Sequence, residues 1–425
     1  METRLLSGEQ LKIKPVRSTF FQRGMKALVV SKLSLLRYGR LNLVDSDEVL
    51  CFGSFNSEHP LSVTVTVHHP GFYTAMVFGG SIGVAESYMR GDLDCDDLTG
   101  FVRIFALNES LLLGVDSGFS KFSQLFQRFY HWLNRNSLKG SRKNIEAHYD
   151  LGNDFYRLFL DETMMYSCGI FPGVDSSLYD AQKNRLDVIC RKLDLKPDDR
   201  LLEIGTGWGA LAIHAAKNYG CHVTTTTISK EQYAWTQRCI VDEGLQERIT
   251  LLNEDYRELP DRLNGKFDKL VSIEMIEAIG HVYFDKFFKV CSDLLNPTGL
   301  MLLQTITIKD QRYEAAKGSV DFIQRYIFPG GALPSISAIT DCIKRVTDFT
   351  VFDFQEIGPH YVKTLQCWRS NFFINIEAVR KLGFSETFIR MWEAYFCYCE
   401  GAFAERVIGD AQLLFSKPLN RCRVR

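Results

Sequence analysis

The chain has 425 residues, a formal net charge of −1 at pH 7, and 46% hydrophobic and 24% charged residues. This length is enough for two or three domains with substantial cores, and the composition is ordinary for a globular protein. No apolar run reaches the ~18–20 residues that a membrane-spanning helix needs. We therefore expect any contact with lipid to be made at the bilayer surface.

Charge is distributed unevenly along the chain. Residues 1–45 carry nine Lys or Arg against three Asp or Glu, and residues 117–145 carry six Lys or Arg and no acidic residue. Basic clusters beside aromatic side chains suit an anionic membrane surface, where each cation contributes about 1 kcal/mol. The same clusters could instead be solvated faces or contact nucleic acid.

The twelve cysteines show no metal-ligand spacing, and Cys397 and Cys399 are closer together than the usual zinc-binding pair. No signal peptide precedes them. We therefore expect reduced thiols in a cytoplasmic protein, and no metal site.

Residues 1–134 are expected to form a separate, smaller α+β domain. Residues 63–68 alternate Val and Thr before a final His, which predicts a strand. The glycines of residues 78–83 predict a turn before a helix. Residues 91–97 predict an acidic loop that leads into an apolar helix around 101–113.

An aromatic stripe at helical spacing over residues 119–133 predicts a further helix. It could be a membrane-facing amphipathic helix, a packed core element or a strut between domains. Residues 135–144 are the predicted linker, and a second domain is expected at 145–425.

The second domain alternates strand and helix, which predicts an α/β fold with a Rossmann-like, doubly wound sheet whose ligand lies at the carboxyl ends of the strands. Seven strands are expected, at 201–204, 221–227, 249–253, 268–273, 299–306, 351–357 and 412–417. Residues 308–345 hold no clear strand and residues 361–406 are largely helical, so we expect an insertion and a lid over the sheet.

Three alternating glycines, Gly205, Gly207 and Gly209, follow the first of these strands and open a helix. Glycines at such a turn let a ligand approach the backbone, and the helix N-terminus behind them offers free N–H groups. The pattern alone fits S-adenosylmethionine (SAM) and NAD about equally. Glu203 favours SAM, because a carboxylate at that strand end suits the cationic methionine moiety and repels a pyrophosphate.

Six segments occur in an order that resembles the cyclopropane fatty acid synthase family, which includes the mycolic acid methyltransferases. They are residues 148–156, 165–171, 202–209, 227–232, 272–281 and 360–365. The resemblance covers roughly residues 145–417, and the first domain resembles the extra domain of the long bacterial members. It implies the class I SAM-dependent methyltransferase fold for the second domain.

The resemblance also implies a reaction. A cis alkene in an acyl chain of a membrane phospholipid attacks the methyl group of SAM, and a base removes a proton from the new methyl group so that a cyclopropane closes. The family holds a bicarbonate ion as that base. Because alkenes are weak nucleophiles, catalysis must come from positioning in a dry pocket and from stabilising cationic character.

Carried over by motif, the resemblance places Cys168, Glu277 and Tyr361 at the bicarbonate, Cys168 mainly through its backbone N–H. The implied cofactor residues are Tyr166, Ser167, Glu203, Gly205, Gly207, Gly209, Thr227, Gln232, Tyr256, Arg257 and Ile273. No carboxylate follows the second strand to hold the ribose, and in this family Gln232 takes over that task. Glu274 does not belong to the family's pattern and is given no role.

Gln304 departs from the family at the bicarbonate. Typical members carry His in the Leu-Leu-His-Thr-Ile strand, where it contacts the ion. Gln donates and accepts hydrogen bonds, so we expect Gln304 still to hold the ion, but it carries neither a proton nor a charge. Methyl transfer is therefore more firmly implied than ring closure, because a carbocation that escapes deprotonation can shift a hydride and end as a methylene or methyl branch.

We expect a cytoplasmic, SAM-dependent C-methyltransferase that forms cyclopropanes in unsaturated phospholipids, lies peripherally on the inner face of the membrane, and has no nucleic-acid partner. Methyl branching of the same alkene is the alternative within this class. A small-amine N-methyltransferase, a non-catalytic lipid-binding protein and a NAD enzyme are more distant alternatives. The sequence leaves open whether the chain forms a homodimer.

Overall fold

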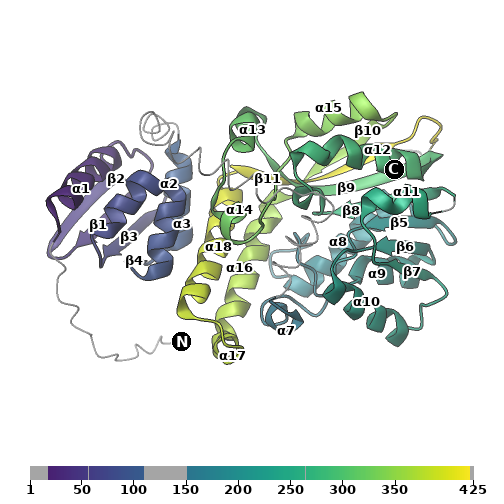
Figure 1. The fold of residues 1–425 in the computed structure, drawn as a ribbon, viewed down its shortest axis with the longest axis horizontal. Coiled ribbons are helices and arrows are strands. Elements are labelled where there is room, and N and C mark those ends of the chain that lie inside the picture. Colours follow the sequence, from purple (N-terminus) through teal and green to yellow (C-terminus); the bar gives the residue numbers. More distant parts are fainter. Residues whose placement is uncertain (1–17, 56, 110–150, 264, 422–425) are drawn as a thin grey trace.

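The computed structural model describes residues 18–55, 57–109, 151–263 and 265–421. Two β-sheets lie at opposite ends of the molecule, and long helices stand between them (Figure 1). The predicted helix at 119–133 and the predicted linker at 135–144 lie outside the described residues. Within the described ranges, no helix combines the length and hydropathy needed to cross a bilayer.

The smaller sheet belongs to the first domain and has four strands in the order β2-β1-β3-β4. The elements of this domain are α1 (Phe20–Leu33), β1 (Gly39–Asp45), β2 (Glu48–Ser54), β3 (Ser62–Val67), α2 (Gly71–Arg90), β4 (Leu93–Cys95) and α3 (Leu98–Leu107). β1 pairs antiparallel with β2 and parallel with β3. The alternation along β3 buries Val63, Val65 and Val67, which confirms the predicted strand.

The turn predicted at residues 78–83 is confirmed at Gly80, whose backbone is not helical and divides α2 into two helical segments. Gly80 has φ +54°, so the chain bends there and the second helical segment follows. Gly83 then lies so close to the first half of the helix that a Cβ would be 2.0 Å from the carbonyl oxygen of Ala75. The glycines therefore allow a sharp bend within one helix.

The acidic segment at residues 91–97 is only partly a loop, because β4 pairs Cys95 with Val65 of β3. The apolar helix predicted around 101–113 is confirmed as α3 over the described residues. It begins earlier than expected, where the Asp97 side chain accepts the backbone N–H of Gly100 at 2.8 Å.

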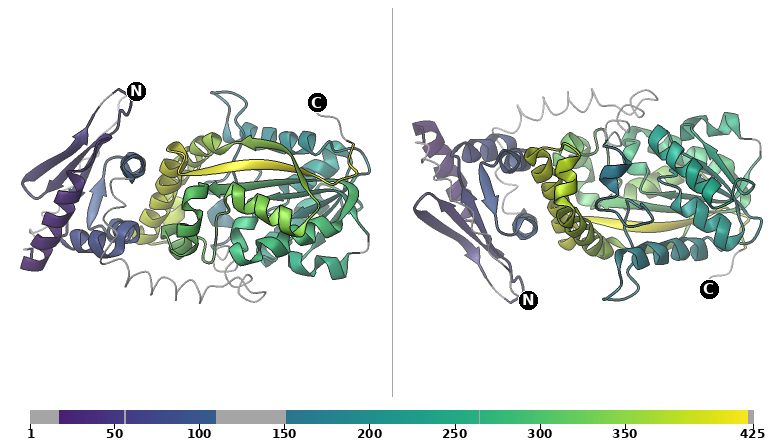
Figure 2. Two further views of the ribbon diagram at one scale, coloured as in Figure 1. Left: turned by 90° about the horizontal axis from the view of Figure 1, so that it is seen from above. Right: turned by 90° about the horizontal axis from the view of Figure 1, so that it is seen from below.

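The larger sheet has seven strands in the order β10-β11-β9-β8-β5-β6-β7. They are β5 (Arg200–Ile204), β6 (His222–Thr226), β7 (Ile249–Leu252), β8 (Phe267–Ile273), β9 (Leu295–Ile308), β10 (Thr350–Glu356) and β11 (Ile408–Ser416). β5 pairs parallel with β6 and β8, whereas β11 runs antiparallel between β9 and β10. Helices lie on both sides of this sheet (Figure 2). All seven predicted strands and the Rossmann-like, doubly wound class are confirmed.

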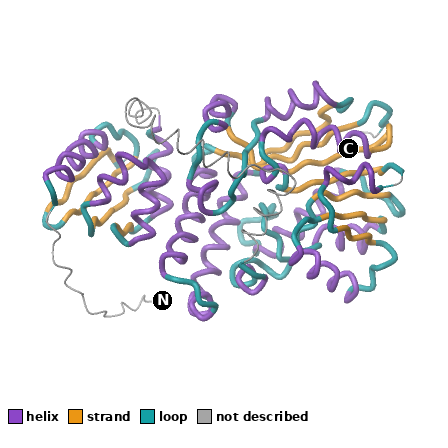
Figure 3. Tube along the Cα trace, in the orientation of Figure 1, coloured by secondary structure: helices purple, strands orange, loops and turns teal. Residues whose placement is uncertain are grey.

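Helices connect these strands, and between β9 and β10 the chain forms helices and loops alone, as expected for residues 308–345 (Figure 3). The helices are α7 (Asn153–Tyr156), α8 (Leu178–Lys192), α9 (Ala210–Tyr219), α10 (Lys230–Asp242), α11 (Leu259–Arg262), α12 (Phe284–Leu294), α13 (Asp310–Lys317), α14 (Phe322–Tyr326), α15 (Ile336–Val346), α16 (Gly358–Ile374), α17 (Ile376–Lys381) and α18 (Glu386–Ala404), with 3-10 turns at Tyr256–Glu258, Ile276–Ala278 and His281–Tyr283. The helical segment predicted at 361–406 is thus confirmed.

An aromatic core joins α7 to α16 and α18. Phe155, Phe159, Trp368, Trp392 and Phe396 are almost entirely buried. The ring centroids of Phe155 and Trp392 are 4.7 Å apart, and those of Phe159 and Phe396 are 5.5 Å apart. Offset and edge-to-face contacts of this kind stabilise a core beyond the area that they bury.

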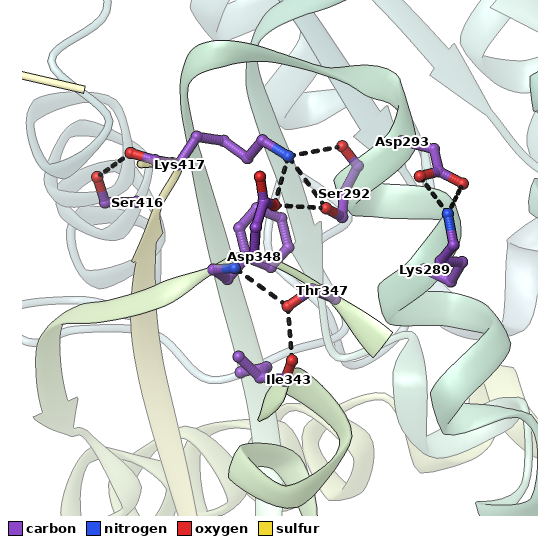
Figure 4. A network of polar contacts seen from close by, with 9 residues as sticks. Lys289, Ser292, Asp293, Ile343, Thr347, Asp348, Ser416 and Lys417 are labelled. Atoms are coloured by element: carbon purple, nitrogen blue, oxygen red, sulfur yellow. Dashed lines mark hydrogen bonds and ion pairs between the residues drawn. The ribbon is translucent and has the colours of Figure 1, made fainter. Parts of the chain in front are cut away.

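A polar network anchors the C-terminal end of β11 (Figure 4). Lys417 donates to both the backbone and the side-chain oxygen of Ser292 in α12, and it pairs with Asp348 before β10. Ser292 Oγ also donates to Asp348 Oδ1 at 2.9 Å. The network holds the end of a strand whose register places several side chains of the site.

α18 packs against the first domain (Figure 2). Glu400 of this helix accepts a hydrogen bond from Thr99 Oγ1 of α3 at 2.9 Å. Next to it, Gly401 lies against Val102, and a Cβ at position 401 would be 2.7 Å from Val102 Cγ1. The two domains therefore approach closely at a residue that has no side chain.

Replacing Gly401 with Ala should lower the free energy of unfolding by about 1–3 kcal/mol, because the new methyl group overpacks this contact. The matched change Gly24→Ala lies in α1, where a Cβ would meet no atom within 4 Å. This change should leave the free energy of unfolding unchanged or raise it by roughly 0.5–1 kcal/mol, because Ala favours a helix more than Gly does. Chemical denaturation measures both values, and equal stability of the two variants would contradict the close packing of α18 on α3.

Candidate functional site

A cavity of about 1320 Å³ lies at the carboxyl ends of β5, β6 and β8 and extends to α2 and α3 of the first domain. The predicted residues on its wall are Tyr166, Ser167, Glu203, Gly205, Gly207, Thr227, Gln232, Tyr256, Arg257, Ile273, Glu277 and Tyr361. Three other predicted residues, Cys168, Gly209 and Gln304, are not part of the wall. The structure thus gathers most of the expected site around one space.

The glycine turn between β5 and α9 forms one end of the cavity. Gly205 and Gly207 have φ values of +102° and +55°, which favour glycine. A Cβ on Gly207 would meet no atom within 4 Å, so its backbone faces open space. Gly209 has a different task, because a Cβ there would lie 2.7 Å from Cγ2 of Thr236. Gly209 therefore allows α9 to pack closely against α10, and its contact with the cofactor stays a prediction.

Glu203 lies at the end of β5 and is only 2% exposed. Its Oε2 accepts a hydrogen bond from Thr225 Oγ1 at 2.5 Å. Burial raises the pKa of the Glu203 carboxyl to about 8. A cationic ligand would favour the ionised form of such a carboxyl, so the site suits the ammonium group of an amino acid.

Thr227 and Gln232 lie together where β6 leads into α10. Thr227 Oγ1 donates to Gln232 Oε1 at 2.9 Å, which fixes the orientation of the amide. Ser229 caps α10 by accepting the backbone N–H of Gln232. With its oxygen engaged, Gln232 presents its amide nitrogen as a donor at the cavity wall, which suits the hydroxyl oxygens of a ribose.

Tyr256, Arg257 and Ile273 form the part of the wall expected at the adenosine. The Tyr256 hydroxyl is buried without a hydrogen-bond partner among the described residues. Arg257 pairs with Asp255 at 2.6 Å, and its guanidinium lies 5.1 Å from the centre of the Tyr283 ring. Arg257 is therefore held rigidly, and Tyr256 keeps a polar atom for a ligand.

Arg185 of α8 is a wall residue that the sequence analysis missed. It is 2% exposed, and its Nη1 donates to Ser167 Oγ at 2.6 Å. Beside it, Tyr166 donates its hydroxyl hydrogen to Tyr395 of α18 at 2.9 Å. No local signal identifies Arg185, because a charged residue on an amphipathic helix is usually at the surface.

Glu274 is the centre of a polar cluster on the cavity wall, although the sequence analysis gave it no role. Its Oε1 accepts the backbone N–H of Cys168 at 2.9 Å and the side-chain amide of Gln304 at 2.7 Å. Its Oε2 accepts the hydroxyl hydrogen of Tyr361 at 2.8 Å. Three donors from separate segments therefore converge on one carboxylate.

These three donors are those that the resemblance assigned to a bicarbonate ion. Because Glu274 engages each of them, the residues present do not fit a bicarbonate at this position. The expected contacts of Cys168, Gln304 and Tyr361 with that ion are corrected to contacts with Glu274. The signal for this difference was the carboxylate that directly follows β8.

Glu277 lies next to this cluster and is not hydrogen-bonded to Tyr361 or Gln304 in the described structure. Its Oε1 accepts from Thr305 Oγ1 at 2.9 Å and from the backbone N–H of Ile306. Its buried Oε2 has no partner among the described residues. Burial, and then the charge of Glu274, raise the pKa of the Glu277 carboxyl to about 8.

Two residues of β11 complete the cluster from behind the wall. Asp410 Oδ2 accepts from Gln304 Nε2 at 3.2 Å, and burial and the charges of Glu274 and Glu277 raise the pKa of Asp410. Gln412 donates to Gln304 Oε1 at 3.0 Å, which turns the Gln304 amide nitrogen toward Glu274. Sequence reasoning missed both residues, because only the pairing of β9 with β11 brings them to Gln304.

The cavity continues as an apolar arm between the first domain, α14 and α18. Its wall there includes Met76, Val84, Phe101, Phe105, Ile323 and Phe328. Leu28 of α1 and Phe78 of α2 also belong to the wall and are each 40% exposed. The arm therefore reaches the surface of the molecule among apolar side chains.

The model of the family "Mycolic acid cyclopropane synthetase" matches residues 136–413. The cyclopropane-fatty-acyl-phospholipid synthase of Escherichia coli is 36% identical over 366 residues, which cover 83% of this chain and 87% of that protein. The tuberculostearic acid methyltransferase UfaA1 of Mycobacterium tuberculosis is 34% identical over 363 residues, which cover 81% of each chain.

A solved structure agrees with these relatives. The mycolic acid cyclopropane synthase CmaA1, crystallised with SAH and CTAB, is 33% identical to this chain with a TM-score of 0.58. The match covers 65% of this chain and 98% of that one. SAH is what SAM becomes when it gives up its methyl group, so the likeness supports SAM as the cofactor of this chain.

Replacing Gly207 with Val should weaken SAM binding by about tenfold or more, because the side chain would enter the space that the backbone leaves open. Gly244→Val is the matched control, since Gly244 has φ +67°, equally open surroundings and no place on the cavity wall. Both variants carry similar backbone strain, but only the first should lose affinity in calorimetric titration. Unchanged affinity in a folded Gly207→Val protein would contradict the placement of the cofactor.

The glycine turn and the buried Glu203 line one cavity at the carboxyl ends of the seven-stranded sheet, and the family model spans most of the domain that carries them. The relatives extend the likeness into the first domain, since they cover more than four-fifths of the chain. The chain is a SAM-dependent methyltransferase and belongs to the mycolic acid cyclopropane synthetase family.

Proposed function

We propose that this enzyme transfers the methyl group of SAM to an alkene carbon in an unsaturated acyl chain of a membrane phospholipid, and that the product is a cyclopropane. One observation carries the proposal. A single cavity joins the glycine turn to an apolar arm, and it has Glu274, Glu277 and Tyr361 on its wall.

The apolar arm supports an acyl chain as the substrate. A hydrocarbon chain gains free energy when it leaves water for a space lined by Met, Phe and Ile side chains. A small amine would gain nothing from this arm, which argues against N-methylation. A protein that only binds lipid would have no need of the glycine turn and the carboxylates that share the cavity.

The residues of the site explain how a weak nucleophile could react. The packed aromatic wall, in which Tyr361 stacks on Phe403 at 4.3 Å, excludes water and fixes the position of the alkene. Carboxylate and aromatic groups stabilise the positive charge that develops when the alkene carbon takes the methyl group. Bicarbonate has no part in this proposal, because its expected donors contact Glu274.

Ring closure is the finer part of the proposal. Among the relatives, one is named as a cyclopropane synthase and another as a methyltransferase, so both outcomes are represented. A carboxylate beside the developing cation favours rapid proton loss from the new methyl group, and rapid loss leads to the ring. Slow loss would instead allow a hydride shift and a branched product.

Membrane association completes the proposal, and it would place the enzyme on the inner, cytoplasmic face of the membrane. Phe20 and Phe21 at the start of α1 are 87% and 54% exposed, and the Phe21 ring lies 6.3 Å from that of Phe78. This apolar surface adjoins the open end of the arm and belongs to the basic region 1–45. An acyl chain could enter the arm directly from the bilayer.

Cells that express the enzyme should gain phospholipids whose unsaturated acyl chains are heavier by one methylene group. Lipid mass spectrometry measures this gain, and chromatography against a cyclopropane standard separates the ring from a methylene branch. A Gly207→Val enzyme serves as the inactive control. Unmodified acyl chains in cells that contain folded enzyme and SAM would contradict the proposal.

The double change Phe20→Ser, Phe21→Ser should weaken binding to anionic phospholipid vesicles, because it removes the exposed apolar side chains of α1. Binding should also fall as salt rises, since the Debye length is only about 8 Å at physiological ionic strength. Val174→Ser is the control, because Val174 is 90% exposed but belongs to the second domain. Co-sedimentation that responds equally to both changes would rule out this surface.

A further inference from the structure

The carboxyl group of Glu274 is positioned to take part in the reaction. It lies on the wall of the cavity, and three hydrogen-bond donors direct its two oxygens. Resting on the proposed function, we propose that the Glu274 carboxylate is the base that removes the proton from the new methyl group, in place of a bound anion. The enzyme would then work without bicarbonate.

The groups around Glu274 direct positive charge and partial positive charge at its carboxyl group. A carboxylate that accepts several hydrogen bonds is stabilised as an anion, because each donor directs positive partial charge at it. The buried guanidinium of Arg185 adds a full positive charge whose interaction reaches Glu274. Burial raises the pKa of the nearby Glu277 carboxyl to about 8, and burial and neighbouring carboxyl groups raise the pKa of Asp410.

The backbone conformation of Glu274 is a second, independent observation that supports its role as the base. Its φ of +46° lies in the left-handed region, which a residue with a long side chain rarely adopts. The backbone N–H donates to Gln304 O at 2.8 Å, so the strand pairing holds this conformation. Strained residues that the fold maintains are typical of functional sites. Glycine would adopt this backbone conformation without strain. The strain therefore arises because the position carries a side chain with a carboxyl group.

The reaction balances with Glu274 as the base. The π electrons of the alkene form a bond to the methyl carbon of SAM, and the C–S bond breaks with its electron pair on sulfur to leave SAH. One alkene carbon is then positive. Glu274 takes a proton from the new methyl group, and the electrons of that C–H bond close the third side of the ring. The resulting carboxylic acid returns its proton to solvent after the product leaves.

Two variants of the same residue separate this role from a structural one. Glu274→Gln keeps the shape of the side chain but removes the base, so turnover should fall about 100-fold or more. Glu274→Gly also removes the base, but it relieves the backbone and frees the three donors for an external anion. Both variants should bind SAM with unchanged affinity in calorimetric titration.

Bicarbonate is the probe that distinguishes the Glu274→Gln and Glu274→Gly variants. The wild-type enzyme should have the same turnover in bicarbonate-depleted and bicarbonate-supplemented buffer. Added bicarbonate should restore turnover to Glu274→Gly but not to Glu274→Gln, in which the amide still fills the space. With ¹³C-labelled bicarbonate, NMR should detect binding to the Gly variant and none to the wild type.

Three results would overturn the inference. They are a wild-type enzyme that needs bicarbonate, a Glu274→Gln variant with full turnover, and a folded Glu274→Gly variant that neither binds bicarbonate nor is rescued by it. The NMR measurement requires no substrate. If the wild type fails to methylate any lipid, the proposed function is wrong, and bicarbonate binding to the Gly variant alone still tests whether Glu274 fills an anion site.

Discussion

The pairing of β9 with its two neighbours fixes the positions of Glu274, Gln304 and Gln412 relative to one another. On one side, the backbone N–H of Glu274 donates to Gln304 O, and on the other, Gln412 of β11 lies opposite Gln304 and donates to its side chain. Side chains alternate between the faces of a strand, so a shift of one residue would turn Gln304 away from the site. The network at Lys417, which anchors β11, therefore serves the site from a distance (Figure 4).

The same apolar surroundings that suit an acyl chain also decide which carboxyl groups carry charge. Glu203 and Glu277 are buried, and the pKa of each is raised to about 8, so both hold a proton at neutral pH until a cation approaches. Glu274, in contrast, accepts hydrogen bonds from three donors. Hydrophobic substrate binding and the raised pKa values of Glu203 and Glu277 thus have one cause, the exclusion of water.

Local patterns in the sequence predicted the parts of the fold that depend on neighbouring residues. The alternation in β3, the short apolar run of β5 and the glycines at the bend of α2 are signals of this kind. The motifs also predicted site residues, most of which lie on the cavity wall. They missed Glu274, Asp410 and Gln412, because their roles arise from strand register and from a left-handed backbone that no local pattern specifies. The sequence showed that Gln304 replaces the family's usual His, but it did not show that Gln304 contacts Glu274.

The packing of α18 on the first domain has a consequence for biosynthesis. Thr99 and Glu400 contact one another although they are 301 positions apart, and Tyr88 and Glu393 are 305 apart. At ~5–20 residues per second, a ribosome needs about 15–60 s to complete α18 after it has made α3. The first domain must therefore spend that interval with one face uncovered, either stable by itself or protected by a chaperone, and the cavity that both domains line can form only once nearly the whole chain has been made.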